Sequence, residues 1–328
     1  MKVESNEEAE YKLPSDLSVK EIPTAKSNIE NPPLAERNVI PKLGTSCIFN
    51  GTTGMGKSTL LANLCTDPRF YAYNDKKTFD HRFLISPTAE GDDVQKKYDI
   101  DKGNTFTDLN MAPMIIKTIM EEQKELVKKF GSDKAPQILL IYDDVISHPD
   151  FMRTDEFVKS FIASRHYNLT TMICSQSWTA VPRRCRLQAR NIFFFASPQS
   201  EVELLTLEHC PPRFNKKQFM SLVNWATHEP YSFLYINKSA QMEDRYHKNL
   251  SEIIDLNKFR ALVSNARDSR ESQIDHLYST ENPKEDPNLK EENAEQDVVS
   301  GKSSNGAQSS RRKNSEIITS RKTKRQRI

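Results

Sequence analysis

This sequence has few cysteines, no long apolar run and almost no net charge. Its five cysteines are scattered and form neither a C-x-x-C pair nor a pair with histidine at metal-ligand spacing. That pattern is typical of reduced intracellular thiols and argues against structural zinc and disulfides. The net charge is only +2, so any attraction to nucleic acid must come from local clusters of basic residues.

Long hydrophobic segments are missing too. Only 36% of the 328 residues are hydrophobic, which indicates that a sizeable part of the chain is solvated tail. The longest wholly apolar run near the core is 192–196, far short of a membrane span, and the amino terminus is charged rather than signal-like. We therefore expect an intracellular protein that is neither secreted nor attached to a membrane.

Composition divides the chain into three parts. Residues 1–37 are rich in charged residues and prolines and lack periodicity, which predicts a disordered amino-terminal segment. In 38–263, strand-like apolar runs alternate with helix-like segments, which predicts an α/β fold with a mainly parallel sheet flanked by helices. Residues 264–328 predict a second disordered tail. It has nine acidic residues against two lysines in 271–297, then eight basic residues against one glutamate in 311–328.

Periodicity predicts the elements of the core. The expected strands are 45–50, 82–86, 137–142, 170–175, 192–196 and 231–236. The expected helices are 57–65, 112–130, 154–164, 200–207 and 215–225.

The most informative motif is the run GTTGMGKS at 51–58, which fits the phosphate-binding loop pattern G-x-x-x-x-G-K-[ST]. Glycines let such a loop turn tightly, so that its amides and the following helix N-terminus cradle phosphates. Lys57 would reach the β- and γ-phosphates, and the Ser58 hydroxyl would ligate Mg²⁺. The predicted nucleotide-binding residues are Gly51, Thr52, Thr53, Gly54, Met55, Gly56, Lys57, Ser58 and Thr59.

A second predicted strand ends in carboxylates. The run ILLIYDD at 138–144 has the apolar character of a central parallel strand, with Asp143 and Asp144 at its carboxyl end, where open α/β sheets bind ligands. Asp143 is predicted to hold Mg²⁺, and Asp144 to orient and deprotonate the attacking water. The alternative is an ordinary buried strand whose Asp pair caps the next element.

A third strand-like run, TMICSQ at 171–176, ends at Gln176. We expect this side chain between the phosphate loop and the acidic strand, bonded to the water or the γ-phosphate, unless it merely caps its strand. An inserted strand with a polar tip is typical of hydrolytic, motor-like P-loop proteins rather than nucleotide kinases and GTPases. The GTP-reading pattern N-K-x-D is not matched by NKSA at 237–240, so ATP is favoured over GTP.

Several arginines follow. A ring ATPase needs an arginine from one subunit in its neighbour's site, and such a finger supplies about 10³ to 10⁵ in rate. Arg165, Arg186 and Arg190 are candidates. A solvated or phosphate-contacting basic face explains any one of them equally well, and the alternatives stay open.

In this order, the motifs resemble those of the genome-packaging ATPases of the FtsK-HerA superfamily. This group is found in poxviruses and other large DNA viruses, virophages and virus-like Maverick (Polinton) elements. The resemblance covers about 38–236. It is carried by FNGTTGMGKS at 49–58, ISPT at 85–88, LIYDD at 140–144, SRHYNL at 164–169, SQS at 175–177, and VP at 181–182 leading to Arg186 and the strand 192–195. One position departs from the expected pattern, since Gln188 stands where the group has asparagine.

That resemblance implies a RecA-like domain in a homo-oligomeric ring that uses ATP and Mg²⁺ to translocate double-stranded DNA into a capsid. A capsid or portal protein would be a further partner, and the nucleus or a viral assembly site of a eukaryotic host the location. The expected catalytic residues are Asp144, Gln176, Arg165 and Arg186. Two other classes remain open: a P-loop kinase, and a non-catalytic nucleotide-dependent assembly factor.

Overall fold

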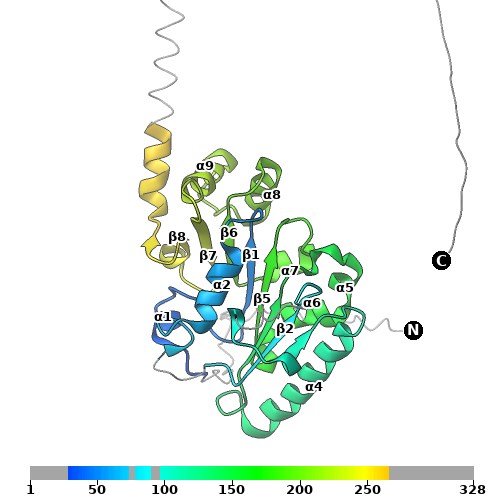
Figure 1. Ribbon diagram of the computed structural model, residues 1–328. Helices are drawn as coiled ribbons and strands as arrows, with labels where there is room; N and C mark the ends of the chain where they lie inside the picture. Colours follow the sequence, from blue (N-terminus) through cyan, green and yellow to red (C-terminus); the bar gives the residue numbers. More distant parts are fainter. Residues whose placement is uncertain (1–28, 74–77, 90–96, 266–328) are drawn as a thin grey trace, which may run out of the picture. The chain divides into compact units, whose positions relative to one another are not determined.

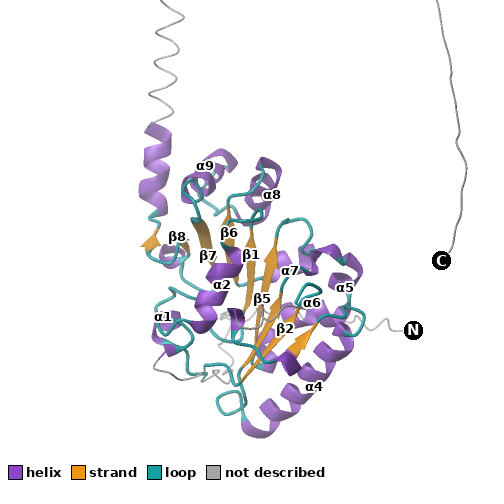
Figure 2. Cartoon of the chain, in the orientation of Figure 1, coloured by secondary structure: helices purple, strands orange, loops and turns teal. Residues whose placement is uncertain are grey.

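A nine-stranded sheet forms the centre of the described part of the chain, which comprises residues 29–73, 78–89 and 97–265 of a computed structural model (Figures 1 and 2). The strands are β1 (Ser46–Asn50), β2 (His81–Ile85), β3 (Thr105–Phe106), β4 (Ile138–Tyr142), β5 (Leu169–Ser175), β6 (Asn191–Phe195), β7 (Phe233–Asn237), β8 (Tyr246–Lys248) and β9 (Glu252–Ile253). Their order across the sheet is β3-β2-β4-β5-β1-β6-β7-β8-β9. The strands from β3 to β6 are parallel, and β7, β8 and β9 continue the sheet in antiparallel pairs.

Helices cover both faces of this sheet (Figure 2). They are α1 (Pro33–Glu36), α2 (Lys57–Thr66), α4 (Ala112–Phe130), α5 (Pro149–Arg153), α6 (Asp155–Ile162), α7 (Arg183–Gln188), α8 (Gln199–His209) and α9 (Lys216–Ala226). Short 3-10 turns are η2 (Lys102–Asn104), η3 (Val145–Ser147), η4 (Ser164–Tyr167) and η5 (Met242–Asp244). A last helical stretch occupies 256–265.

Two hydrophobic cores lie on opposite faces because successive strand residues point to opposite sides. In β1, Ile48 joins the core beneath α4 to α9, whereas Cys47 and Phe49 join the core beneath α1 and α2. β4 is buried along its whole length. A central strand covered on both faces therefore appears in the sequence as a continuous apolar run rather than an alternating one.

Local sequence signals fix several helix ends. The Thr154 side chain accepts a hydrogen bond from the Phe157 amide and so caps α6. A capping box between Asn215 and Gln218 starts α9. Gly131, with φ of 84°, ends α4. These signals explain why the expected helix bounds agree closely with those observed.

The predicted α/β fold with a mainly parallel sheet is confirmed, and each of the six expected strands is present. Two kinds of element were not expected: the short elements β3, β8, β9, α1, α5 and α7, and the helical stretch 256–265. Residues 29–37, expected to be disordered, contain α1, with Ala35 fully buried and the Asn31 side chain accepting from the Leu43 amide at 2.8 Å. Residues 264 and 265, also expected to be disordered, end the helical stretch 256–265, and the remaining residues of the two expected tails, 1–28 and 266–328, lie outside the described residues.

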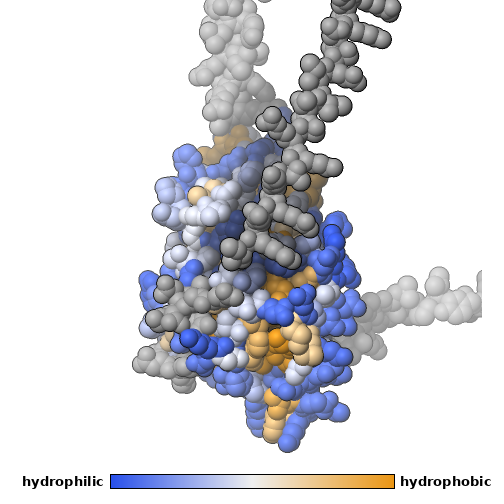
Figure 3. Space-filling model, turned by 45° about the vertical axis from the view of Figure 1, so that its right-hand side comes forward, coloured by the Kyte–Doolittle hydropathy of each residue, from blue (hydrophilic) through white to orange (hydrophobic). Residues whose placement is uncertain are grey.

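Figure 3 shows one face, on which hydrophilic residues surround an apolar patch. Exposed large hydrophobic residues include Met111 and Met114, at the start of α4. Among the described residues, no helix has the length and apolar character needed to cross a membrane.

Candidate nucleotide-binding site

Strand order brings the three predicted motifs to one edge of the sheet. β5 lies between β1 and β4, as expected for the inserted strand. The last residue of β1, Asn50, is in register with Ser175, the last residue of β5. Because the three strands are parallel, the residues that follow them meet at their common carboxyl edge.

The phosphate loop turns sharply between β1 and α2. Its first residue, Gly51, has no room for a side chain, since a Cβ there would lie 2.6 Å from the Cβ of Phe195. Its last glycine, Gly56, has φ of 88° and ψ of 9°, a left-handed conformation that favours glycine. α2 therefore begins at Lys57 with its first amides unpaired within the helix.

A cavity of about 830 Å³ lies over this edge. The predicted site residues that line it are Thr53, Gly54, Gly56, Lys57, Ser58, Thr59, Asp143, Asp144 and Gln176. Gly51, Thr52 and Met55 belong to the loop without lining the cavity. The structure thus brings the phosphate loop, the Asp pair and Gln176 together.

Lys57 is buried at the base of the loop, with 7% of its surface exposed. Its Nζ donates to the carbonyl oxygens of Gly51 at 2.7 Å and Thr52 at 2.8 Å. Burial lowers the pKa of Lys57, and the neighbouring acidic groups, Asp143 and Asp144 among them, oppose that shift.

The two aspartates have different surroundings. The Tyr98 hydroxyl donates to Oδ2 of Asp143 at 2.9 Å. Burial raises the pKa of Asp143, while the bond from Tyr98 partly offsets the shift. Asp144 has φ of 56°, and its Oδ2 accepts from the Thr88 hydroxyl at 3.0 Å. Asp144 precedes η3 but makes no side-chain cap there, so capping does not explain its carboxylate.

Gln176 connects the strand tip to the loop, because its Oε1 accepts from the Thr53 hydroxyl at 3.0 Å. Its amide nitrogen has no partner among the described residues, which leaves a donor at the cavity. Tyr98 and Lys97, which also belong to this neighbourhood, were missed by sequence reasoning. Thr88 belongs to the ISPT run at 85–88, but the sequence did not predict its contact with Asp144.

Arg186 lies outside this cavity, in a buried ion pair. Its guanidinium donates to both carboxylate oxygens of Glu208, at 2.8 and 2.9 Å, and to the carbonyl oxygen of Val181 at 2.6 Å. Burial favours the neutral acid, yet the hydrogen bonds from Arg186 and Trp178 leave the pKa of Glu208 below its usual value. Arg186 is 6% exposed and ties α7 to α8.

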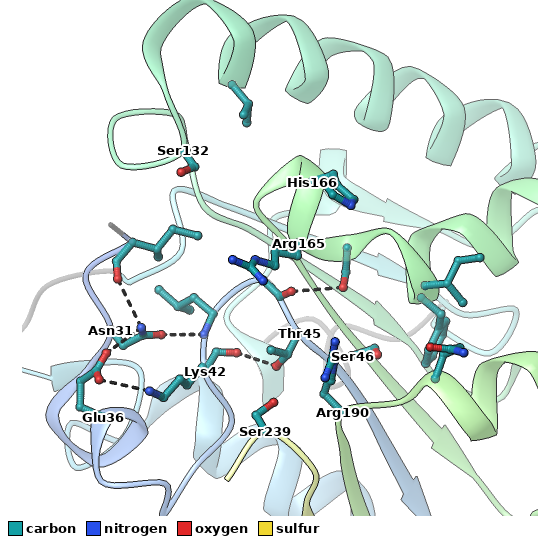
Figure 4. Close-up of a pocket in the computed structure, with 18 residues that line it drawn as sticks. Asn31, Glu36, Lys42, Thr45, Ser46, Ser132, Arg165, His166, Arg190 and Ser239 are labelled. Atoms are coloured by element: carbon teal, nitrogen blue, oxygen red, sulfur yellow. Dashed lines mark hydrogen bonds and ion pairs between the residues drawn. The ribbon is translucent and has the colours of Figure 1, made fainter. Parts of the chain in front are cut away.

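Arg165 lines a second cavity, of about 890 Å³, together with Arg190 (Figure 4). Thr45 and Ser46, at the start of β1, also line it, so this cavity lies at the amino edge of the parallel strands. Neither guanidinium has a carboxylate partner within the described ranges, whereas Lys42, nearby, pairs with Glu36 at 3.3 Å. The structure does not bring Arg165 or Arg186 to the cavity that holds the phosphate loop.

Comparison with known proteins gives one family match. The family model described as Poxvirus A32 protein matches residues 36–246. No curated protein matches the chain.

Several solved structures are similar in fold. B204, the DNA-packaging ATPase from Sulfolobus Turreted Icosahedral Virus, has 13% identity and a TM-score of 0.45, and the match covers 63% of this chain and 97% of that one. B204 from Sulfolobus turreted icosahedral virus 2, in complex with AMP, has 15% identity and a TM-score of 0.44, covering 64% and 98%. EssC (ATPases 2 and 3) from Geobacillus thermodenitrificans has 14% identity and a TM-score of 0.42, covering 71% and 45%.

Proposed function

Because this chain belongs to the poxvirus A32 protein family, we propose that it is a viral genome-packaging ATPase that hydrolyses ATP to translocate double-stranded DNA into a capsid. Its source would be a virus or a virus-like Maverick (Polinton) element. The observation that carries the enzymatic part is the convergence of the phosphate loop, Asp143, Asp144 and Gln176 on one cavity. Family membership supports the packaging part.

The phosphate loop would bind the triphosphate through its amides and Lys57. In the structure, the Lys57 ammonium donates to two loop carbonyls, which are neutral acceptors. Phosphate oxygens are charged acceptors and form stronger hydrogen bonds. Lys57 would therefore turn from the carbonyls to the β- and γ-phosphates.

The donor set fits Mg²⁺. Ser58 and Asp143 line the same cavity, and Mg²⁺ typically takes one or two carboxylates together with phosphate oxygens and waters. The described residues contain no group of three His, Cys, Asp or Glu side chains that could hold a metal ion. Mg²⁺ bound with a nucleotide does not require such a group. The bound ion would neutralise phosphate charge. Tyr98 would hold the Asp143 carboxylate in orientation.

Asp144 and Gln176 would act on the attacking water. The Asp144 carboxylate has one oxygen bonded to Thr88, and its other oxygen would accept the proton of the water. Gln176 is held through its carbonyl oxygen by Thr53, so its amide NH₂ would donate to the water or the γ-phosphate.

A homo-oligomeric ring would complete the site. Arg165 faces a cavity at the far edge of the sheet, so we assign it to the site of a neighbouring subunit, with Arg190 beside it. Arg186 would serve that role only by leaving Glu208, and we assign it to holding α7 against α8. The ATPase domain would span 38–263. A capsid or portal protein would be a further partner of the ring. Packaging would take place at the viral assembly site or in the nucleus.

The test is ATP turnover by an oligomer of defined size, with and without double-stranded DNA. The wild type should hydrolyse ATP faster when DNA is added, and Lys57→Ala should lose most nucleotide affinity and turnover. Lys117→Ala, an exposed lysine on α4 outside this cavity, is the matched control and should behave like the wild type. Undiminished turnover in Lys57→Ala would remove the loop from the mechanism, and DNA-indifferent phosphate transfer by a monomer would indicate a kinase.

A further inference from the structure

One part of the nucleotide cavity has no role in the chemistry described above. Strand order places β6 and β7 on the side of β1 away from β5 and β4. β7 is antiparallel, so its first residue, Phe233, pairs with the last residue of β6, Phe195, at the same edge of the sheet. Both phenylalanines line the cavity. The cavity therefore runs from the end of β4, past the phosphate loop, to the start of β7.

This layout separates the two ends of a bound nucleotide. Neighbouring strands are about 4.8 Å apart, so β4 and β7 each lie roughly 10 Å from the strand that leads into the phosphate loop. The catalytic groups Asp144 and Gln176 occupy the β4 and β5 side, which is where the γ-phosphate must lie. The nucleoside must then lie on the opposite side, near β7.

Tyr231 lines the cavity on that side and is the most exposed large aromatic side chain of the described chain, at 68%. Its ring lies against the end of the phosphate loop, since a Cβ at Gly56 would be 3.4 Å from Tyr231 Cδ1. The Tyr231 hydroxyl has no hydrogen-bond partner among the described residues. Nothing within the described fold accounts for an exposed ring at this place.

The backbone makes this tyrosine more unusual. The Ser232 amide donates to the Glu229 carbonyl at 3.1 Å, which closes a turn with Pro230 and Tyr231 at its centre. Tyr231 has φ of 62°. A turn with proline second and a positive φ third favours glycine at the third position, and a bulky residue there is strained. The side chain is therefore present at a cost to the fold.

Asn63 supplies a polar group on the same side. It lies on α2, six residues after Lys57, so it is about 9 Å further along the helix axis from the phosphates. It is exposed, lines the cavity, and its side-chain amide has no partner within the described residues. An amide offers one donor group and one acceptor, which matches an adenine edge but not the paired acceptors O6 and N7 of guanine.

We propose that Tyr231 stacks on the nucleobase and that Asn63 reads its edge, so that these two residues form the nucleoside subsite of the ATPase. The inference rests on the proposed function, because it assumes a triphosphate on the loop. Tyr231 would distinguish a nucleotide from inorganic polyphosphate, and Asn63 would distinguish adenine from guanine.

The test for Tyr231 compares the affinity of the purified full chain for ATP with its affinity for inorganic tripolyphosphate, both with Mg²⁺. Tyr231→Ala should raise the Kd for ATP on the order of tenfold and leave the Kd for tripolyphosphate unchanged, since only ATP has a base to stack. Tyr231→Phe keeps the ring and should stay within about twofold of the wild type.

Tyr231→Gly separates function from folding. Glycine relieves the positive φ, so this variant should be at least as stable to heat as the wild type and yet bind ATP as weakly as Tyr231→Ala. Equal ATP affinity in the wild type and Tyr231→Ala would overturn the inference. Equal losses of ATP and tripolyphosphate in Tyr231→Ala would also overturn it, because the residue would then act on the phosphate loop.

The two proposals fail in different ways. A wild type that binds tripolyphosphate as tightly as ATP overturns the nucleoside subsite but leaves the phosphate loop in use. A wild type that binds neither overturns both. For Asn63, Asn63→Ala should reduce the preference for ATP over GTP, whereas Tyr231→Ala should weaken both nucleotides alike. An unchanged preference in Asn63→Ala would remove Asn63 from the subsite.

Discussion

Two cavities of the described chain, of about 890 and 830 Å³, lie at opposite edges of one sheet and present different charges. At the carboxyl edge, Lys57, Asp143 and Asp144 are held in place by hydrogen bonds within the chain. At the amino edge, Arg165 and Arg190 have no carboxylate partner among the residues that the structure describes. The first cavity therefore presents a lysine and two carboxylates, whereas the second presents two arginine cations.

The sheet itself keeps these groups apart. β1 has five residues, and at about 3.3 Å per residue it separates the cavities by roughly 16 Å. That is farther than an arginine side chain reaches. If Arg165 takes part in hydrolysis, it must do so in another subunit. The two cavities would then belong to one site shared between subunits.

The largest expected effect is that of Arg165→Ala. Removing a trans-acting arginine should lower ATP turnover by about 10³-fold or more while ATP binding stays nearly normal. Mixing Arg165→Ala subunits with Asp144→Asn subunits should restore some activity, because each can complete the other's site. Arg184→Ala, an exposed arginine on α7 that lines neither cavity, is the control and should remain active. A mixture that stays inactive despite proven co-assembly would contradict the shared site.

The next effect is that of Asp144→Asn. An amide cannot accept the proton of water as a carboxylate does, so turnover should fall by about 10²-fold or more while ATP still binds. The measurements are single-turnover hydrolysis and the Kd for ATP. Asp150→Asn, at an exposed aspartate on α5, is the matched control. Loss of ATP binding equal to the loss of turnover would show that Asp144 holds the nucleotide rather than activating water.

The sequence predicted the elements that neighbouring residues specify, and it missed contacts between residues that are far apart in the chain. Central strands, the long helix 112–130 and the phosphate loop were predicted correctly because apolar periodicity and a contiguous motif specify them locally. The family match confirms the resemblance to viral packaging ATPases. Strands of two or three residues, such as β3, β8 and β9, carry too few residues for a period to show.

The arginines show what the sequence could not decide. Arg186 and Arg190 stand close together in one basic run, yet one is buried and the other lines a cavity. The difference comes from Glu208, 22 residues away from Arg186, which only the packing of α7 and α8 brings into contact. Tyr98 was missed for the same reason, since it meets Asp143 from 45 residues away.

Arg186→Met tests whether Arg186 supports the fold or, as proposed for Arg165, takes part in hydrolysis. Without Arg186, the buried Glu208 carboxylate keeps only the Trp178 indole donor and the more distant Arg183, and the loss should cost about 3 kcal/mol of unfolding free energy. The double variant Arg186→Met/Glu208→Leu should recover most of that stability, as apolar replacements of buried pairs often do. If ATP turnover recovers with stability, Arg186 is structural. A stable double variant that lacks turnover would return Arg186 to the list of catalytic candidates.

The smallest expected effect concerns heat stability, and it distinguishes the two cavities without any nucleotide. Burial raises the pKa of Asp143 above its usual value. Between the usual pKa of an aspartate and this raised pKa, the folded chain binds more protons than the unfolded chain. The free energy of unfolding therefore falls as the pH rises through that window, and it stays lower at neutral pH. Asp143→Asn removes the buried charge while its side-chain oxygen can still accept from Tyr98. Its Tm at neutral pH should therefore exceed that of the wild type, and the difference should shrink as the pH approaches 4. The same variant should lose Mg²⁺-dependent turnover, as expected where function retains a destabilising group.

Arg165→Ala, which removes an exposed cation, should leave Tm unchanged at both pH values. An unchanged or lower Tm in Asp143→Asn at neutral pH would contradict the buried charge, and a large shift in Arg165→Ala would show that the amino-edge cavity also supports the fold.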